Sequence, residues 1–366
     1  MAAIGGALGE ERAAEAAALR NLRRFRSRIL FIVLALAGLG VLAIWCTSVG
    51  AANIGMQKVV SILAHKMGAP LPADLKASEV TVVTHLRLPR IATAVLGGAA
   101  LGVSGTVMQG VTRNPLVSPY TLGVSAAAAF GASLAIIVGF GEMAGGQWVI
   151  VTAAFACALL SAALVFGAGL RVGTAPETVI LTGIALMYLF VAGTATIQFL
   201  ATEEQLASVV HWTFGSLTRA GWLAVIVMAV ISLVSWPFLF RHAWSLNAMA
   251  SGGDDFARSL GVPVERVRFS VCFVAVLLTS TVISFTGVIG FVGLVAPHMA
   301  RIIIGTDHRL LLPFSGIVGA WLLLAADLAG RVLVAPTVLP VGITVAYLGV
   351  PIFLHLVLRS RQREIA

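Results

Sequence analysis

The sequence has few charged residues. Only 11% of its 366 residues are Asp, Glu, Lys or Arg, while 59% are hydrophobic and the mean hydropathy is +1.01. A soluble globular protein needs polar and charged side chains over much of its surface, so this composition excludes that class. It predicts an all-α, polytopic membrane protein whose surface faces lipid.

Cysteine is also scarce. Cys46, Cys157 and Cys272 are the three in the chain, and all lie in apolar runs. No disulfide framework or metal-ligand spacing is present, so we expect neither redox chemistry nor a metal site. The nearest approach to a metal-binding set is His298 with the pair Asp307 and His308, where capping of a turn is the favoured interpretation.

Nucleotide-binding and catalytic motifs are missing as well. The sequence contains no G-x-x-x-x-G-K-[ST] loop to hold a nucleotide's phosphates and no distinctive nucleophile and base pair. We therefore expect no catalytic residues, no bound cofactor and no enzymatic activity. If ATP drives the protein, ATP and Mg are bound by a separate partner chain. The net charge is +9, but the sequence has no basic stripe with interleaved aromatic residues, so nucleic acid is not an expected partner.

Long runs of uncharged residues make up most of the sequence. A helix needs about 20 residues to cross about 30 Å of hydrocarbon, and nine runs come near or exceed that length. The run at 269–300 is too long for one span, and Gly287, Gly290 and Gly293 fall where a turn would divide it. Helices over 268–286 and 289–303 then bring the total to ten spans. The nine runs are 29–49, 91–112, 114–141, 143–170, 178–202, 220–240, 269–300, 310–326 and 332–358.

The distribution of basic residues predicts the topology. With ten spans, the loops on one side hold 17 of the 24 Lys and Arg residues, and the other side holds 7. The positive-inside rule places the richer side in the cytosol. The predicted organisation is a cytosolic basic segment at 1–28, a ten-helix membrane domain at 29–358 and a cytosolic basic tail at 359–366.

A cytosolic loop between the sixth and seventh spans, residues 245–262, is predicted to form two short helices joined by a turn at Gly252 and Gly253. Asp254 can cap the second helix, and Gly261 can end it in the left-handed conformation. Its apolar side chains, including Phe256 and Leu260, favour a protein partner. The alternative is a helix pair lying on lipid headgroups, which the acidic pair Asp254 and Asp255 opposes.

Three arginines are predicted at the outer rim. Arg87 and Arg90 flank a proline at the start of the second span, and Arg331 follows the ninth. The guanidinium fork suits carboxylates, so a partner with acidic residues is one interpretation. Anchoring to lipid phosphate is the other, and the spacing does not choose between them.

Two proline-containing turns are predicted at the cytosolic face. One runs from Arg113 to Tyr120, and the other covers 173–176. Proline fixes the backbone angles of such turns, which can constrict a pore or simply join two helices.

Ionisable residues at membrane depth are rare. Asp327 is the clearest, and Arg331 lies four residues on, where the two can form a pair. An ion-coupled secondary transporter would need an intramembrane ion site that these spans do not supply. An intramembrane enzyme is the second alternative, and it lacks candidate catalytic groups.

Several long motifs resemble the FecCD family, the permeases of type II ABC importers that take up iron–siderophore complexes, haem and vitamin B12. The resemblance covers nearly the whole chain. The motifs are RLPRIA at 87–92, QGVTRNPLVSPYTLGVS at 109–125, GFVGLVAPHMAR at 290–301, TDHRLLLP at 306–313 and LPVGIT at 339–344.

The resemblance implies a type II ABC importer permease fold in the cytoplasmic (inner) membrane of a bacterium or archaeon. It implies a homodimer, with a heterodimer left open, two cytosolic ATPase subunits and a periplasmic or lipid-anchored binding protein. The expected substrate is a ferric siderophore, then haem, with corrinoid or molybdate as alternatives.

The resemblance also assigns roles to single residues. Binding-protein docking falls to Arg87, Arg90 and Arg331, and the cytoplasmic gates to Asn114, Leu116, Thr174 and Ala175. Coupling to the ATPase falls to Asp254, Asp255, Phe256, Arg258, Leu260 and Gly261. The fifth span and the short helix after it are expected to line the path.

Overall fold

The computed structural model describes the backbone of residues 2–50, 54–70, 75–140, 143, 145–172 and 175–365, and their side chains except at 2–24, 170, 172, 357 and 359–365. Throughout these ranges the regular structure is helical and no strand occurs, which confirms the all-α prediction. The elements are α1 (Ala2–Ser48), α2 (Met56–Lys66), α3 (Ala77–Thr81), η1 (Val82–Arg87), α4 (Leu88–Thr112), η2 (Pro119–Leu122), α5 (Val124–Ile137), α6 (Gly146–Val172), α7 (Pro176–Leu200), α8 (Glu203–Thr213), η4 (Leu217–Arg219), α9 (Trp222–Arg241), α10 (Ala243–Ser259), α11 (Val264–Thr286), α12 (Val292–Ile304), α13 (His308–Val332) and α14 (Val341–Ile365).

Seven of the described helices are long and apolar enough to cross a membrane. They lie in α1, α4 with the preceding α3 and η1, α6, α7, α9, α11 and α13. Three shorter apolar helices, α5, α12 and α14, occupy the other positions where spans are predicted. Each predicted span therefore has a helix, and the count of ten complete spans stays a prediction.

The long seventh run divides as predicted. α11 ends at Thr286, and Gly287 follows with a φ of 76° that favours glycine. α12 begins at Val292, directly after Phe291, whose φ is also positive at 63°. Two residues in such backbone conformations cannot belong to one continuous helix, so the run forms two.

Two predicted boundaries are wrong. The run at 114–141 yields the 14-residue helix α5, because the segment containing Pro115 and Pro119 forms a turn and a short 3₁₀ helix first. The last span was expected to begin at 332. Instead α13 continues to Val332 and α14 begins at Val341, after an irregular segment that contains Pro336 and Pro340.

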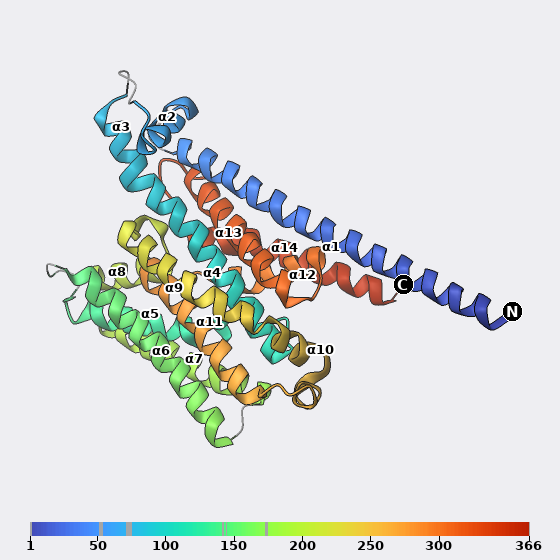
Figure 1. The fold of residues 1–366 in the computed structure, drawn as a ribbon. Coiled ribbons are helices and arrows are strands. Elements are labelled where there is room, and N and C mark those ends of the chain that lie inside the picture. The colour runs from blue at the N-terminus through green and yellow to red at the C-terminus, as the bar shows by residue number, and fades with distance from the viewer. Residues whose placement is uncertain are drawn as a thin grey trace.

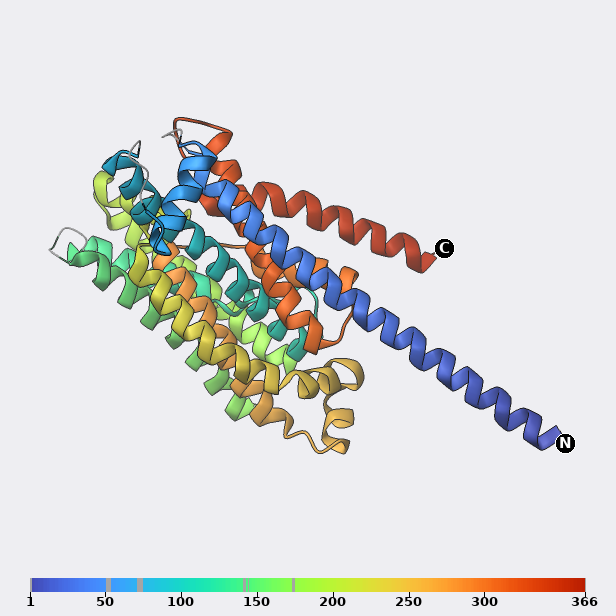
Figure 2. The same ribbon diagram turned by 45° about the horizontal axis from the view of Figure 1, so that its top comes forward.

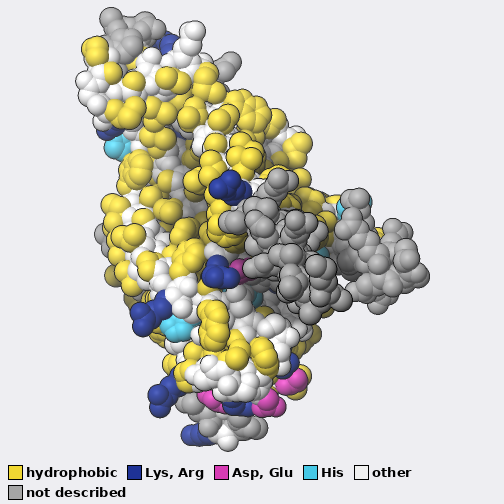
Figure 3. All heavy atoms as spheres, turned by 45° about the vertical axis from the view of Figure 1, so that its right-hand side comes forward, with side chains coloured by type: hydrophobic (Ala, Val, Ile, Leu, Met, Phe, Trp, Pro, Cys, Tyr) yellow, Lys and Arg dark blue, Asp and Glu magenta, His cyan; other side chains and the backbone are white. Residues whose placement is uncertain are grey.

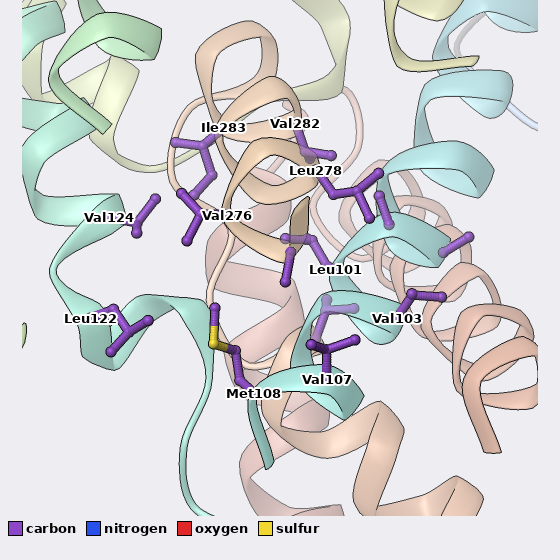
Figure 4. Close-up of a cluster of buried hydrophobic side chains, with 14 of the residues drawn as sticks. Leu101, Val103, Val107, Met108, Leu122, Val124, Val276, Leu278, Val282 and Ile283 are labelled. Atoms are coloured by element: carbon purple, nitrogen blue, oxygen red, sulfur yellow. The ribbon is translucent and has the colours of Figure 1, made fainter. Parts of the chain in front are cut away.

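α4 and α13 form the centre of the bundle. In their most apolar stretches 83% and 72% of the residues are buried, against 11% for α1 and 17% for α7. Glycine allows the two backbones to approach closely, since a Cβ at Gly98 would lie 2.8 Å from Ala320 Cα and one at Gly102 would lie 3.0 Å from the Ser315 carbonyl carbon. Figure 4 shows apolar side chains of α4, α5 and α11, including Leu101, packed beside this pair.

The two ends of the bundle differ. In Figures 1 and 2, α2 and α3 lie at one end, whereas α10 and both chain termini lie toward the other. Hydrophobic side chains cover much of the face seen in Figure 3 between these ends. This pattern agrees with a bundle whose flanks contact lipid.

Candidate functional site

The three predicted docking arginines meet at the α2–α3 end of the bundle. Arg87 ends η1, Arg90 lies in the first turn of α4, and Arg331 lies in the last turn of α13. With Arg219 they line a cavity of about 1060 Å³, here called the arginine cavity. Its described lining residues include no Asp or Glu, so the cavity presents cations to whatever enters it.

Two of these arginines also hold the end of α1. Arg87 donates to the carbonyl oxygens of Thr47 at 2.7 Å and Ser48 at 3.0 Å, and Arg331 donates to those of Cys46 at 3.0 Å and Val49 at 2.8 Å. The last carbonyls of a helix have no partner within it and carry the negative end of its dipole. The guanidinium groups therefore act as the cap of α1.

Asp327 is the buried counter-charge of the cluster. Its side chain is completely buried, and its Oδ1 accepts a hydrogen bond from Arg90 Nε at 2.8 Å. Its Oδ2 lies 3.1 Å from Arg331 Nε, which confirms the predicted pair between these two residues. The bond to Arg90 was not predicted, and it ties α4 to α13.

Arg219 in η4 is the fourth arginine of this cavity, and it was not among the predicted docking residues. Its guanidinium contacts His211, at 2.6 Å to Nδ1 and 2.9 Å to the carbonyl oxygen, and burial lowers the pKa of Arg219. It also lines a neighbouring cavity of about 690 Å³ beside α8, so it lies between the two. The sequence signal was present, because Arg219 is the one Lys or Arg in the loop 203–219.

The predicted gate residues lie in different surroundings. Asn114 Oδ1 accepts a hydrogen bond from the Leu116 backbone N–H at 2.9 Å, which closes a tight turn. Leu116 is 58% exposed. Ala175 directly precedes α7 and is also exposed, and Thr174 lies outside the described residues. Their gating role stays a prediction.

Asn114 and Leu116 line two different cavities. Asn114 lines a cavity of about 670 Å³ beneath α10, here called the α10 cavity. Leu116 instead lines a cavity of about 860 Å³, the apolar cavity, together with Tyr120, Phe291 and Tyr347. The turn after α4 therefore borders both spaces.

α10 carries the segment predicted to couple to a partner. It bends at Gly253, whose φ of 80° and ψ of −172° separate two helical parts, as predicted from the paired glycines. Gly261 follows it with the predicted positive φ, also 80°. Phe256 and Leu260 are 46% and 45% exposed and line the α10 cavity.

The charged residues of this segment contact one another and α11. Asp254 accepts a hydrogen bond from the buried Arg268 at 2.6 Å. Arg258 contacts Asp255 at 2.8 Å and Glu265 at 2.6 Å, and the hydrogen bond that it donates to Glu265 raises the pKa of Arg258. Asp255 remains fully exposed.

The predicted capping of the turn before α13 is confirmed. Asp307 Oδ1 accepts a hydrogen bond from the Arg309 backbone N–H at 3.1 Å. Although burial opposes ionisation, bonds from Arg309 and Asn247 lower the pKa of Asp307. No group of three or more His, Cys, Asp or Glu side chains in the described part of the chain is arranged to hold a metal ion.

Comparison with known proteins places this architecture in a family. An ABC transporter permease protein of Methanocaldococcus jannaschii is 42% identical over 346 residues, covering 92% of this chain and 97% of that protein. The iron(3+)-hydroxamate import system permease FhuB of Bacillus subtilis is 35% identical over 338 residues, covering 90% and 84%.

A solved structure agrees with the sequence relatives. The inward-facing structure of a metal-chelate type ABC transporter superposes with a TM-score of 0.78 at 31% identity, covering 90% of this chain and 99% of the other. The family model of the FecCD transport family matches residues 30–359 of this chain. The chain therefore belongs to the FecCD transport family and is a permease of the ABC importer class.

Proposed function

We propose that this chain, as a homodimer, moves a ferric siderophore across the cytoplasmic membrane, driven by two ATPase subunits and supplied by a binding protein. The observation that carries the proposal is the placement of two unlike sites at opposite ends of the central pair α4 and α13. The arginine cavity lies at one end, and α10 with its cavity lies at the other.

The arginine cavity is the proposed dock for the binding protein. Four arginines line it, and Asp327, the nearest carboxylate in contact with them, is buried below. Acidic side chains of a partner would enter a cationic recess whose guanidinium groups are already oriented by the α1 carbonyls and by Asp327. The partner's carboxylates would then share donors that the chain itself positions.

The α10 end is the proposed ATPase dock. Phe256 and Leu260 are exposed beside a cavity, and aromatic residues in such positions commonly dominate binding energy. This end also carries both termini, and their Arg-rich sequences support a cytosolic location under the positive-inside rule. The localisation that follows is a multi-pass protein of a bacterial or archaeal inner membrane.

The apolar cavity is proposed to form part of the transport path in each subunit of the homodimer. Its volume of about 860 Å³ is within the range of ligand-binding cavities, and its lining combines aromatic residues with hydroxyl groups such as Ser118 and Thr121. A large chelate with an organic surface fits this lining. Molybdate, a small anion, would be favoured by cationic side chains, and the described lining includes no Arg, Lys or His. Haem and corrinoid are the remaining alternatives.

The test is reconstitution of the complete complex in liposomes. We expect ATP hydrolysis to be stimulated, and radioactive iron to be taken up, when the binding protein is loaded with a ferric hydroxamate. Haem-loaded and corrinoid-loaded binding proteins are the matched comparisons. Stimulation by one of these and none by the ferric hydroxamate would reject the proposed substrate, and ATP-independent uptake would reject the mechanism.

A further inference from the structure

One asparagine joins α10 to the first turn of α13. Asn247 lies in the first part of α10, and its Nδ2 donates to Asp307 Oδ1 at 2.8 Å. Its Oδ1 accepts from the backbone N–H of His308, also at 2.8 Å, and lies 2.8 Å from His308 Nδ1. Both ends of one side-chain amide thus contact the residues that begin α13.

The pattern of donors and acceptors is fully determined. Asp307 accepts from Asn247 Nδ2, so the amide oxygen of Asn247 faces His308 and can only accept. Nδ1 of His308 must then carry the proton, and His308 Nε2 is left as the unprotonated nitrogen. That nitrogen is buried against Gly110 of α4, where an added Cβ would lie 2.5 Å away.

The joint is the directional link between the first part of α10 and α13, while Asp254 in the second part of α10 bonds to Arg268 of α11. Leu246 and Met249 bury apolar side chains nearby, but apolar contacts have no preferred direction and allow one helix to slide over another. The α10 cavity lies beside this joint, because Asn247, Asp307 and His308 are all among its lining residues. Hydrogen bonds fix distance and angle together, so Asn247 sets the position of α10 relative to α13.

The first turn of α13 is connected to the opposite end of the molecule. α13 runs without a break from His308 to Val332 and is packed against α4 through the close contact at Gly98. Its far end carries Asp327, which holds Arg90 of α4. A displacement of α13 at His308 therefore reaches both α4 and the arginine cavity.

We infer that Asn247 is a positioning residue that transmits movement of α10 to α13 and α4 through its bonds to Asp307 and His308. This inference rests on the proposed function, in which an ATPase moves α10. Asn247 itself need not touch the ATPase, because Phe256 and Leu260 supply the exposed surface.

The decisive variants change the hydrogen-bond pattern and then restore it. Asn247→Asp places two carboxylates against each other, and Asn247→Ala removes all three hydrogen bonds. In Asn247→Asp combined with Asp307→Asn, the roles are exchanged: the new amide nitrogen at 307 donates to the carboxylate at 247, which still accepts from His308. The amide oxygen at 307 then accepts the capping bond from the Arg309 backbone N–H. Ser251→Ala is the matched control, because Ser251 lines the same cavity but its hydroxyl bonds only to α10 carbonyls, at 2.8 Å to Asn247 and 3.4 Å to Ala248.

The experiment compares these variants in the complete complex, in liposomes, with a ferric hydroxamate as the transported probe. Each of Asn247→Asp and Asn247→Ala is expected to weaken the link by about the free energy of one hydrogen bond. We therefore expect the amount of iron transported per ATP hydrolysed to fall about tenfold in both variants. Affinity for the ATPase is expected to stay within about twofold of the wild type, since the exposed α10 side chains are unchanged. The exchanged double variant should recover most of the lost transport per ATP, and Ser251→Ala should behave as the wild type.

The outcomes separate the two proposals. If the wild type takes up iron with ATP and Asn247→Asp transports as much per ATP as Ser251→Ala does, the role of Asn247 is refuted while the proposed function stands. The role is also refuted if the double variant is as uncoupled as the single ones. If the wild-type complex shows no ATP-driven uptake, the proposed function fails and this inference falls with it.

Discussion

The two ends of this molecule differ in how far their ion pairs are buried. At the arginine cavity the charged groups are turned inward: Asp327 is fully buried, and the Arg331 side chain is only 7% exposed. At α10 the pair of Asp255 and Arg258 is turned outward, with Asp255 fully exposed and Arg258 47% exposed, although Asp254 bonds to the buried Arg268 of α11. Each end nevertheless contains Arg–Asp pairs of similar length, 2.7 Å for Arg90–Asp327 and 2.8 Å for Arg258–Asp255.

Burial, and not the distance between the two charged groups, decides how much such a pair contributes to stability. A buried charge loses its hydration, so its partner is needed to keep it stable, whereas an exposed pair is screened by water and contributes little. The arginine cavity is therefore a site that the chain holds rigid before any partner arrives. The α10 end presents the exposed apolar side chains of Phe256 and Leu260 and the exposed pair of Asp255 and Arg258.

The largest effect that tests this contrast is expected for Asp327→Ala. It would leave Arg90 and Arg331 without their buried carboxylate, and breaking a buried pair typically costs about 3–5 kcal/mol. We expect SDS-induced unfolding of the purified chain to shift by that amount. Asp255→Ala is the control, because it removes an exposed carboxylate from a pair of similar length and should leave the unfolding curve unchanged. Equal stability of the two variants would remove the basis of the contrast.

At the other end, Phe256→Ala should act on partner binding and not on the fold. The ring is 46% exposed in the chain alone and becomes costly to lose only if a partner buries it. Truncation of an aromatic anchor costs about 2 kcal/mol or more, so ATPase affinity should fall at least about thirtyfold. Affinity measured with the purified ATPase checks this. Unchanged affinity would mean that the ATPase contacts lie elsewhere on the chain.

A smaller effect is expected from Gly261→Val. Gly261 has a φ of 80°, and the N–H groups of Gly261 and Val262 donate to the carbonyls of Arg258 and Ala257, which ends α10. No atom lies within 4 Å of an added Cβ, so the cost is the left-handed backbone itself, about 1–2 kcal/mol for a branched residue. Gly261→Asn should lose less, since Asn tolerates this conformation. Comparison of SDS unfolding for the two variants tests this, and equal losses would contradict it.

The same contrast limits what the sequence alone can predict. The pair of Arg331 with Asp327 follows from their spacing of four residues on one helix, and the break at Gly287 follows from the length of the uncharged run. The bond from Arg90 to Asp327 could not be predicted, because it joins residues 237 positions apart and depends on how α4 packs on α13. The joint at Asn247 was missed for the same reason, since an asparagine in a loop carries no signal of its distant partner.

Features set by local backbone preferences were easier to predict. The bend at Gly253 and the left-handed Gly261 depend on local backbone preferences, and both agree with the sequence. The shortened α5 shows the limit of counting apolar residues, because Pro115 and Pro119 override the hydrophobicity of the run. Local chemistry therefore predicts α10 well and the arginine cavity only in part.

The smallest effect is expected from Arg258→Gln, and it is the sharpest test of the outward-facing end. Arg258 contacts Asp255 at 2.8 Å and Glu265 at 2.6 Å, so geometry alone would rank it with Arg90. Its partners are fully and 55% exposed, and water and salt screen such pairs. We expect an unchanged SDS unfolding curve and an unchanged rate of dissociation from the ATPase, because a charge at the rim of an interface affects mainly the association rate. Any change in that rate should disappear at high ionic strength. A loss of stability comparable to that of Asp327→Ala would show that the α10 charges, like those of the arginine cavity, hold the fold together.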